Sequence, residues 1–246
     1  MDIQKTGGKM MEQIYTIPIN EAFEESLEDA RPVCPFCRIR KKFEDNEIDI
    51  ILGASMMEPA VRIKTNELGF CEEHYSKMLA AGKKLPVALM LESHLDEVTE
   101  KMTVGKIFRA ARAKGSAKKV SKVSRSCYIC ERLGDNFDKL TDNAVHLWLQ
   151  DSEFRQKAAK QKCYCLPHYS AFLEKASSVM KKSDFCTFSS SLYSVEEKYF
   201  AKVKENVSAF IKKFDYRFAD EPLDEERDAV EKAISALCGQ DPTQNL

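Results

Sequence analysis

Two short motifs of cysteine and histidine, each present twice, constrain this chain more than any other feature of its sequence. The motifs are C-x2-C at Cys34 and Cys37, C-x2-H at Cys71 and His74, C-x2-C again at Cys127 and Cys130, and C-x2-H again at Cys165 and His168. The two C-x2-C motifs are 93 residues apart, and the two C-x2-H motifs are 94 residues apart. A long internal period of this kind indicates a duplicated structural unit.

Each copy of the repeat offers three thiolates and one imidazole, which is a complete ligand set for a tetrahedral zinc ion. Two cysteines separated by two residues reach one ion from a tight turn, and Cys and His at positions i and i+3 share one face of a helix. We therefore expect one zinc site within each copy. The predicted ligand sets are Cys34, Cys37, Cys71 and His74 in the first copy, and Cys127, Cys130, Cys165 and His168 in the second.

Other interpretations of the motifs are available. A single C-x2-C motif is also compatible with two ordinary buried thiols or with a redox pair. Mixed Cys and His ligation of an iron–sulfur cluster is a minority alternative to zinc. Two complete ligand sets in register favour metal binding over the thiol interpretations.

Three of the nine cysteines lie outside the ligand sets: Cys163, Cys186 and Cys238. Cys163 could replace Cys165 as a ligand, but the repeat register and the C-x2-H spacing favour Cys165. We expect Cys186 and Cys238 to be small apolar residues on helix faces. An odd number of cysteines without an export signal argues for a reducing compartment, so we expect a cytoplasmic protein.

The composition excludes several classes of protein. The formal net charge of the 246-residue chain is −1 with 31% charged residues, so the chain as a whole is neither strongly basic nor strongly acidic. No apolar run approaches the roughly 20 residues that a membrane-spanning helix requires. The first residues lack the basic-then-apolar pattern of a secretory signal.

Apolar periodicity predicts an all-α protein in which two duplicated zinc-knuckle-plus-helix units pack with long C-terminal helices. One exception is residues 14–19, where β-branched residues and Pro18 predict a short extended segment. In the second copy, Asp135 or Asn136 is expected to cap a helix. The predicted division is a first unit at 13–104, a basic linker at 105–126, a second unit at 127–182 and C-terminal helices at 183–239 that pack on both units.

Two segments have further possible partners. The helix predicted at 189–214 has a sustained apolar face, which packs within the chain or forms a homodimer. Residues 106–125 contain eight lysines and arginines and no acidic residue. A solvated linker is the simpler interpretation of this segment, and attraction to nucleic acid or to an acidic partner is the alternative.

Several longer sequence segments resemble those of a bacterial family of unknown function, DUF6062, and the resemblance covers residues 13–239. They include Cys34-Pro35-Phe36-Cys37, Met57-Glu58-Pro59-Ala60-Val61-Arg62, Leu68-Gly69-Phe70-Cys71, Leu91-Glu92-Ser93-His94-Leu95 and Cys165-Leu166-Pro167-His168. The resemblance implies a bacterial cytoplasmic protein and supplies no activity. It also marks Glu58, Arg62, Glu92 and His94 as a possible surface site.

These observations favour a non-enzymatic protein with two structural zinc sites that support a helical scaffold or a partner-binding surface. The alternatives are a nucleic-acid-binding or regulatory protein that uses 106–125, and a thiol redox or metal sensor with Cys163 as its labile position. An enzyme is disfavoured, because the sequence has no glycine-rich phosphate loop, nucleophile elbow or His-Glu-x-x-His motif. Glu92 and His94, at i and i+2, point to different sides of a helix.

Overall fold

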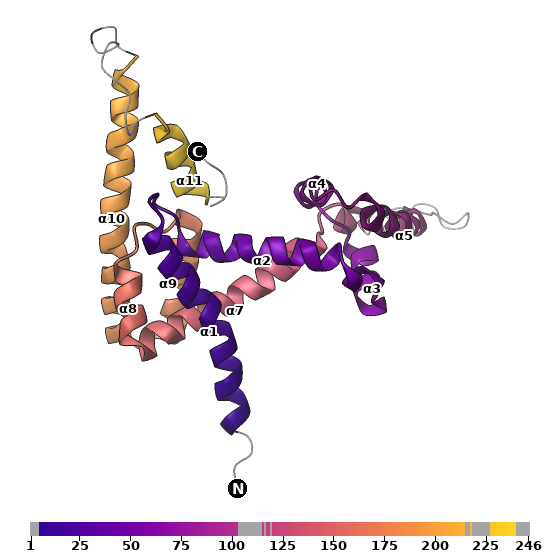
Figure 1. Ribbon diagram of the computed structural model, residues 1–246, viewed down its shortest axis with the longest axis horizontal. Coiled ribbons are helices and arrows are strands. Elements are labelled where there is room, and N and C mark those ends of the chain that lie inside the picture. The colour runs from indigo at the N-terminus through magenta and orange to yellow at the C-terminus, as the bar shows by residue number, and fades with distance from the viewer. Residues whose placement is uncertain are drawn as a thin grey trace. The chain divides into compact units, whose positions relative to one another are not determined.

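Every regular element within the described residues is helical, as predicted (Figure 1). The computed structural model describes residues 5–102, 115, 117–118, 120–214, 217 and 227–239, with side chains from residue 16 onward. Of the helices in this part of the chain, none combines the length and the apolar character needed to cross a bilayer.

The sequence repeat is also a repeat of helices. In the first copy the helices are α2 (Pro35–Ile51), α3 (Pro59–Leu68), α4 (Glu72–Ala80) and α5 (Lys84–Met102), with a 3-10 turn η1 (Ala54–Met57) between the first two. In the second copy they are α7 (Tyr128–Gln150), α8 (Ser152–Ala159), α9 (Leu166–Val179) and α10 (Lys182–Lys212). Two more helices are α1 (Lys5–Glu28) and α11 (Ala229–Cys238).

The chain forms two compact units that do not coincide with the two copies. Unit 1 contains Met1–Lys41 and Phe137–Leu246, and unit 2 contains Lys42–Asn136. Unit 2 is therefore an insertion in the sequence of unit 1, and the boundaries fall inside α2 and α7. The boundaries predicted from the sequence lie between the copies instead.

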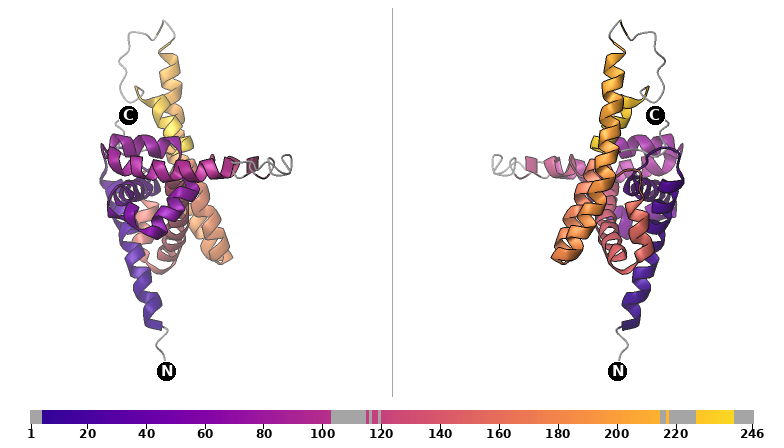
Figure 2. Two further views of the ribbon diagram at one scale, coloured as in Figure 1. Left: turned by 90° about the vertical axis from the view of Figure 1, so that its right-hand side faces the viewer. Right: turned by 90° about the vertical axis from the view of Figure 1, so that its left-hand side faces the viewer.

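Unit 1 has an aromatic core. Phe36 lies 4.9 Å from Phe172 and 5.5 Å from Phe23, measured between ring centroids, and both pairs are edge-on. Tyr164 is fully buried among them. Helix α10 buries one face within the chain through Phe188, Leu192, Val195 and Tyr199, and it packs against α9 and α11. Figure 2 shows the yellow α11 beside the orange α10. Whether other parts of α10 form a homodimer stays a prediction.

Unit 2 has an aliphatic core with fewer aromatic rings. Met78, Ile129 and Ile51 are its most deeply buried members. Glu47 is buried beside this core and binds Arg132 through two hydrogen bonds, of 2.6 and 2.8 Å. A bidentate pair of this kind satisfies both carboxylate oxygens, which a buried charge requires.

The local predictions were partly wrong. Residues 14–19 are helical within α1, which contains Pro18. The β-branched residues of this segment favour an extended backbone, but a helix buries Ile19, Ala22 and Phe23 on one face, and this burial decides the conformation. Helix α7 begins at Tyr128 rather than near Asp135. Most of the basic segment 106–125 lies outside the described residues.

Gly69 ends α3 and sets the approach to the second ligand motif. Its φ of 61° is in the left-handed region, which glycine adopts without strain. A methyl group at this position would lie 2.5 Å from Nε2 of His94. The carbonyl of Gly69 accepts a 2.9 Å hydrogen bond from the Tyr128 amide, which brings Cys71 and Cys127 to the same place.

We predict that Gly69→Ala destabilises unit 2 by at least about 2 kcal/mol, because it adds a steric clash to left-handed strain. Gly82→Ala is the matched control: Gly82 also has a positive φ of 76°, but a methyl group there would meet no atom within 4 Å. Its expected cost is about 1 kcal/mol from strain alone. Urea unfolding of both variants measures the difference, and equal losses would contradict the clash with His94.

Candidate metal centres

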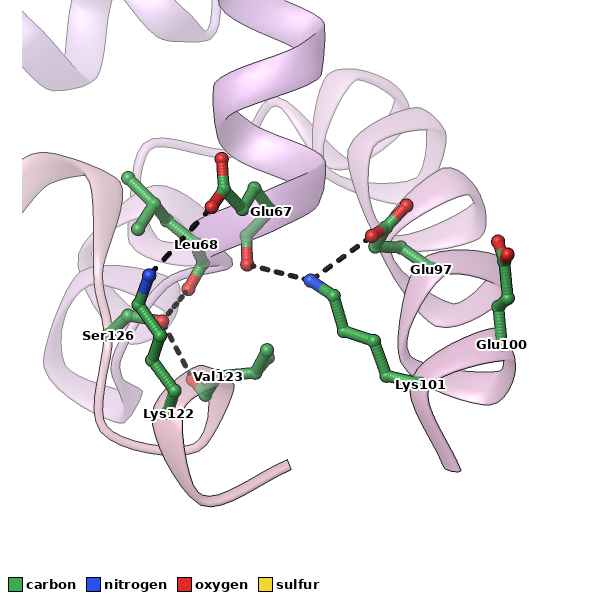
Figure 3. Close-up of a pocket in the computed structure, with 8 residues that line it drawn as sticks. All are labelled: Glu67, Leu68, Glu97, Glu100, Lys101, Lys122, Val123 and Ser126. Carbon is green, nitrogen blue, oxygen red and sulfur yellow. Dashed lines mark hydrogen bonds and ion pairs between the residues drawn. The ribbon is translucent and has the colours of Figure 1, made fainter. Parts of the chain in front are cut away.

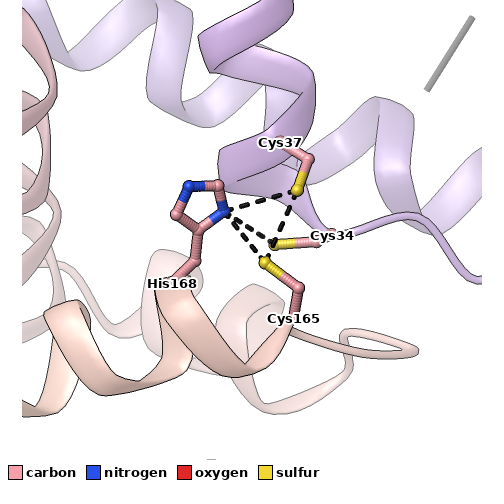
Figure 4. A group of neighbouring side chains, drawn as sticks. All are labelled: Cys34, Cys37, Cys165 and His168. Atoms are coloured by element: carbon pink, nitrogen blue, oxygen red, sulfur yellow. Dashed lines mark hydrogen bonds between the residues drawn. The ribbon is translucent and has the colours of Figure 1, made fainter. Parts of the chain in front are cut away.

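The eight ligand residues gather into two clusters, and each cluster combines one motif from each copy. We name the first cluster A, which is Cys34, Cys37, Cys165 and His168, and the second cluster B, which is Cys71, His74, Cys127 and Cys130. In each cluster the four ligand atoms lie within 4.8 Å of one another. Figure 4 shows the four side chains of cluster A converging on one point.

The predicted grouping of ligands within one copy was therefore wrong. The C-x2-C motif of the first copy meets the C-x2-H motif of the second, and the reverse holds for cluster B. The physical reason lies in the long helices. Each C-x2-C motif begins a helix, α2 or α7, that leaves its own unit and ends in the other. The spacing of residues within one copy of the repeat does not reveal that its two motifs bind different partners.

The distances in cluster A suit a single small ion. The Cys37 and Cys165 sulfurs are 3.5 Å apart, and Nδ1 of His168 lies 3.2 Å from Cys165 and 3.4 Å from Cys37. A regular tetrahedron around zinc places sulfurs about 3.8 Å apart and sulfur and nitrogen about 3.5 Å apart. The four donors of cluster A thus fit one tetrahedral ion.

Cluster A is enclosed on all sides by unit 1. All four of its side chains are buried, and the imidazole of His168 stacks on Phe137 with 4.7 Å between ring centroids. The C-terminal end of α11 also lies against it, because a methyl group at Gly239 would be 3.8 Å from the Cys165 sulfur. Water and solutes therefore have little access to these thiols.

Cys163 lies beside cluster A without joining it. It is buried against Tyr199 and Ala236, and it is Cys165 that contacts His168. Burial raises the pKa of the Cys163 thiol well above its usual value, and the nearby Glu196 carboxyl adds to this. Cys163 is therefore held as a neutral thiol, which is a poor ligand and a poor nucleophile.

Cluster B has similar distances between its donors. Nδ1 of His74 lies 3.0 Å from the Cys71 sulfur, 3.3 Å from Cys127 and 3.5 Å from Cys130. The Cys71 and Cys130 sulfurs are 3.9 Å apart. The backbone N–H of Cys130 also donates to the Cys127 sulfur at 3.5 Å, which favours the thiolate. Cluster B fits one tetrahedral ion as well.

A buried carboxylate orients the histidine of cluster B. Nε2 of His74 lies 3.1 Å from Glu44, which also accepts a 2.8 Å hydrogen bond from Lys77. When Nε2 carries the proton, the lone pair of Nδ1 faces the three sulfurs, as a metal ligand requires. Burial would raise the pKa of Glu44, but the hydrogen bonds from His74 and Lys77 lower it to about 2. Glu44 therefore stays ionised.

One thiol in each cluster is acidic even before any ion is considered. Hydrogen bonds from Cys34 and Cys37 lower the pKa of the Cys165 thiol. Burial opposes ionisation of Cys127, but hydrogen bonds from His74 and from the backbone at Cys130 and Cys71, together with the charge of His74, lower its pKa to about 6. Thiolate is the form that binds metal, so a lowered thiol pKa favours binding of a cation at each cluster.

Sequence reasoning missed Glu44, although a signal was present. Glu44 precedes the buried Ile48 and Ile51 by four and seven residues, so it lies on the apolar face of α2. An acidic residue on an apolar helix face requires a buried partner. The spacing of the ligand motifs could not identify that partner as His74.

Two of the four candidate surface residues hold helices of unit 2 together. Arg62 donates to the Leu89 carbonyl at 2.9 Å, and Nδ1 of His94 lies 2.7 Å from the Asn66 carbonyl. These contacts join α3 to α5. Glu58 and Glu92 are exposed.

A mixed-charge pocket of unit 2 lies between α3, α5 and residues 122–126 (Figure 3). Its cations are already paired: Lys101 lies 3.1 Å from Glu97, and Lys122 lies 3.9 Å from Glu67. None of the four candidate surface residues lines it. The pocket therefore presents no concentrated charge to a ligand.

We predict that paired substitutions distinguish the exchanged ligand sets from sets within one copy. Cys34→Ser with Cys165→Ser removes two ligands of cluster A, so the protein should retain one bound ion. Cys34→Ser with Cys71→Ser damages both clusters, so both ions should be lost. Native mass spectrometry counts the ions, and the opposite pattern would restore the grouping within copies.

We predict that Glu44→Gln weakens metal binding at cluster B by about 10- to 100-fold, because it removes the charge that orients His74. Glu47→Gln is the matched control, since Glu47 is a buried carboxylate on the same helix that pairs with Arg132. Competition with a chromophoric chelator measures both affinities. An equal effect of the two substitutions would mean that general destabilisation is responsible.

Comparison with known proteins gives a family and no function. No curated protein and no solved structure matches the chain. The model of a family of unknown function, DUF6062, matches residues 10–244, which is nearly the whole chain. The chain therefore belongs to the DUF6062 family.

Proposed function

We propose that the protein is a non-enzymatic zinc protein whose two Cys₃His sites support a helical scaffold. The observation that carries this proposal is the convergence of four ligand atoms in each cluster to within 4.8 Å. Sulfur-rich sites with tetrahedral geometry favour zinc or an iron–sulfur cluster among the metals that proteins use. The choice between those two rests on distances.

The distances favour one ion in each site. The ligands of an iron–sulfur cluster bind different iron atoms, so they lie further apart than four ligands of a single ion. In cluster A the shortest contacts between donors are 3.2 to 3.6 Å, close to the edge lengths of a tetrahedron around zinc. These contacts leave no room for bridging sulfides between the ligands.

A structural role is supported by the completeness of each ligand set. Catalytic zinc keeps one coordination position open for water or substrate, whereas structural zinc has four protein ligands. Each cluster supplies four. Zinc would hold the start of α2 to the start of α9 at cluster A, and the start of α4 to the start of α7 at cluster B.

We predict that Cys34→Ala unfolds mainly unit 1, and that Cys71→Ala unfolds mainly unit 2. Structural zinc contributes roughly 10–16 kcal/mol in small peptides, against roughly 5–15 kcal/mol for the whole stability of a domain. Hydrogen exchange with mass spectrometry locates the loss of protection in each variant. The substitution Cys186→Ala, at an exposed cysteine outside both clusters, is the control.

The result that would contradict a structural role is a melting curve of both ligand variants that matches the wild type. Elemental analysis of protein purified without added metal tests the identity of the ion. Zinc at about two ions per chain is expected from the two ligand sets.

A further inference from the structure

The two clusters have the same ligands but differ in their access to solvent. In cluster A, Cys34, Cys37 and Cys165 are all buried. In cluster B, Cys130 is exposed and Cys71 is half-buried. The C-terminal end of α11 lies against the Cys165 and Cys37 sulfurs of cluster A, whereas Cys130 of cluster B is exposed in the first turn of α7.

Access matters because a zinc-bound thiolate is still a nucleophile. Its reaction with an oxidant depends on its ionisation and its exposure. Binding to zinc keeps sulfur in the thiolate form in both clusters, so exposure becomes the property that separates them. A second thiol is also close to Cys130, since the Cys71 sulfur is 3.9 Å away.

We propose that cluster B is an oxidant-responsive metal site, in which a peroxide oxidises Cys130 and the ion is released, while cluster A retains its ion. The proposal rests on the proposed function, because both clusters must first bind zinc. It places the sensitive position at Cys130 rather than at Cys163, which is buried against Tyr199 and Ala236.

The chemistry balances with hydrogen peroxide as the oxidant. The Cys130 thiolate attacks one peroxide oxygen, the O–O bond breaks, and the departing hydroxide takes a proton from solvent to form water. The Cys130 sulfenic acid is then attacked by the Cys71 thiolate, and a second hydroxide leaves and is protonated. The two sulfurs lose two electrons, which the peroxide gains, and a disulfide forms.

Release of the ion follows from the loss of two ligands. His74 and Cys127 remain, and two protein ligands hold zinc far more weakly than four. The disulfide itself joins the start of α4 to the first turn of α7, both within unit 2. Reduction of the disulfide regenerates both thiolates, so the reaction is reversible when zinc is supplied.

The test treats the full-length protein, loaded with both ions, with hydrogen peroxide. A chromophoric chelator reports zinc release, and differential alkylation with mass spectrometry identifies the oxidised cysteines. One equivalent of zinc should leave at least about tenfold faster than the second, because exposure controls the rate. The disulfide between Cys71 and Cys130 should appear in the same phase, and reductant with added zinc should reverse it.

A matched pair of variants isolates the role of Cys130. Cys130→His keeps a zinc ligand but removes the nucleophilic sulfur, so the fast phase should disappear. Cys37→His makes the same change at the corresponding position of cluster A, and it should leave the fast phase intact. Cys186 and Cys238 are exposed but belong to neither cluster, so their oxidation should release no zinc.

Several results would overturn the proposal. One is that both ions are released at the same rate. Another is that cysteines of cluster A are oxidised before Cys130. A third is that the fast phase of zinc release persists in the zinc-loaded Cys130→His variant. If Cys130→His binds no ion at cluster B, the order of oxidation in the wild type decides the question. A purified protein that binds no zinc would instead refute the proposed function, so the two failures are distinguishable.

Discussion

The structure depends on an exchange of candidate metal-binding motifs between two copies of one repeat. Each C-x2-C motif stands at the start of a long helix and meets the C-x2-H motif of the other copy. The contacts of cluster A join residues as far as 134 positions apart in the sequence, whereas those of cluster B span at most 59. Closing a long loop costs conformational entropy, which coordination bonds to an ion at cluster A would offset.

The same four ligand types acquire different properties from their surroundings. In cluster A an aromatic core encloses the sulfurs, and His168 is positioned by stacking on Phe137. In cluster B, His74 is positioned by a hydrogen bond to Glu44, and one of the cysteines, Cys130, is exposed. Identical ligand sets are therefore compatible with one enclosed site and one accessible site, and duplication allows the two to diverge.

The sequence was sufficient to predict the all-α class and the helix that carries each C-x2-H motif. It was sufficient because helical periodicity and the C-x2-H spacing are local properties. The grouping of the ligands is a property of the tertiary structure, so the register between copies led to the wrong quartets. The extended segment predicted around Pro18 failed for a related reason, since packing of Ile19 and Phe23 outweighed local propensity.

Insertion of one unit within the other has a consequence for how the protein is made. All four residues of cluster B lie between positions 71 and 130, so unit 2 can assemble this ligand set while the ribosome is still adding later residues. Cys34 and Cys37 must wait until Cys165 and His168 have been synthesised. The ligand set of cluster A can therefore be completed only after that of cluster B, because Cys165 and His168 follow all four cluster B residues in the sequence.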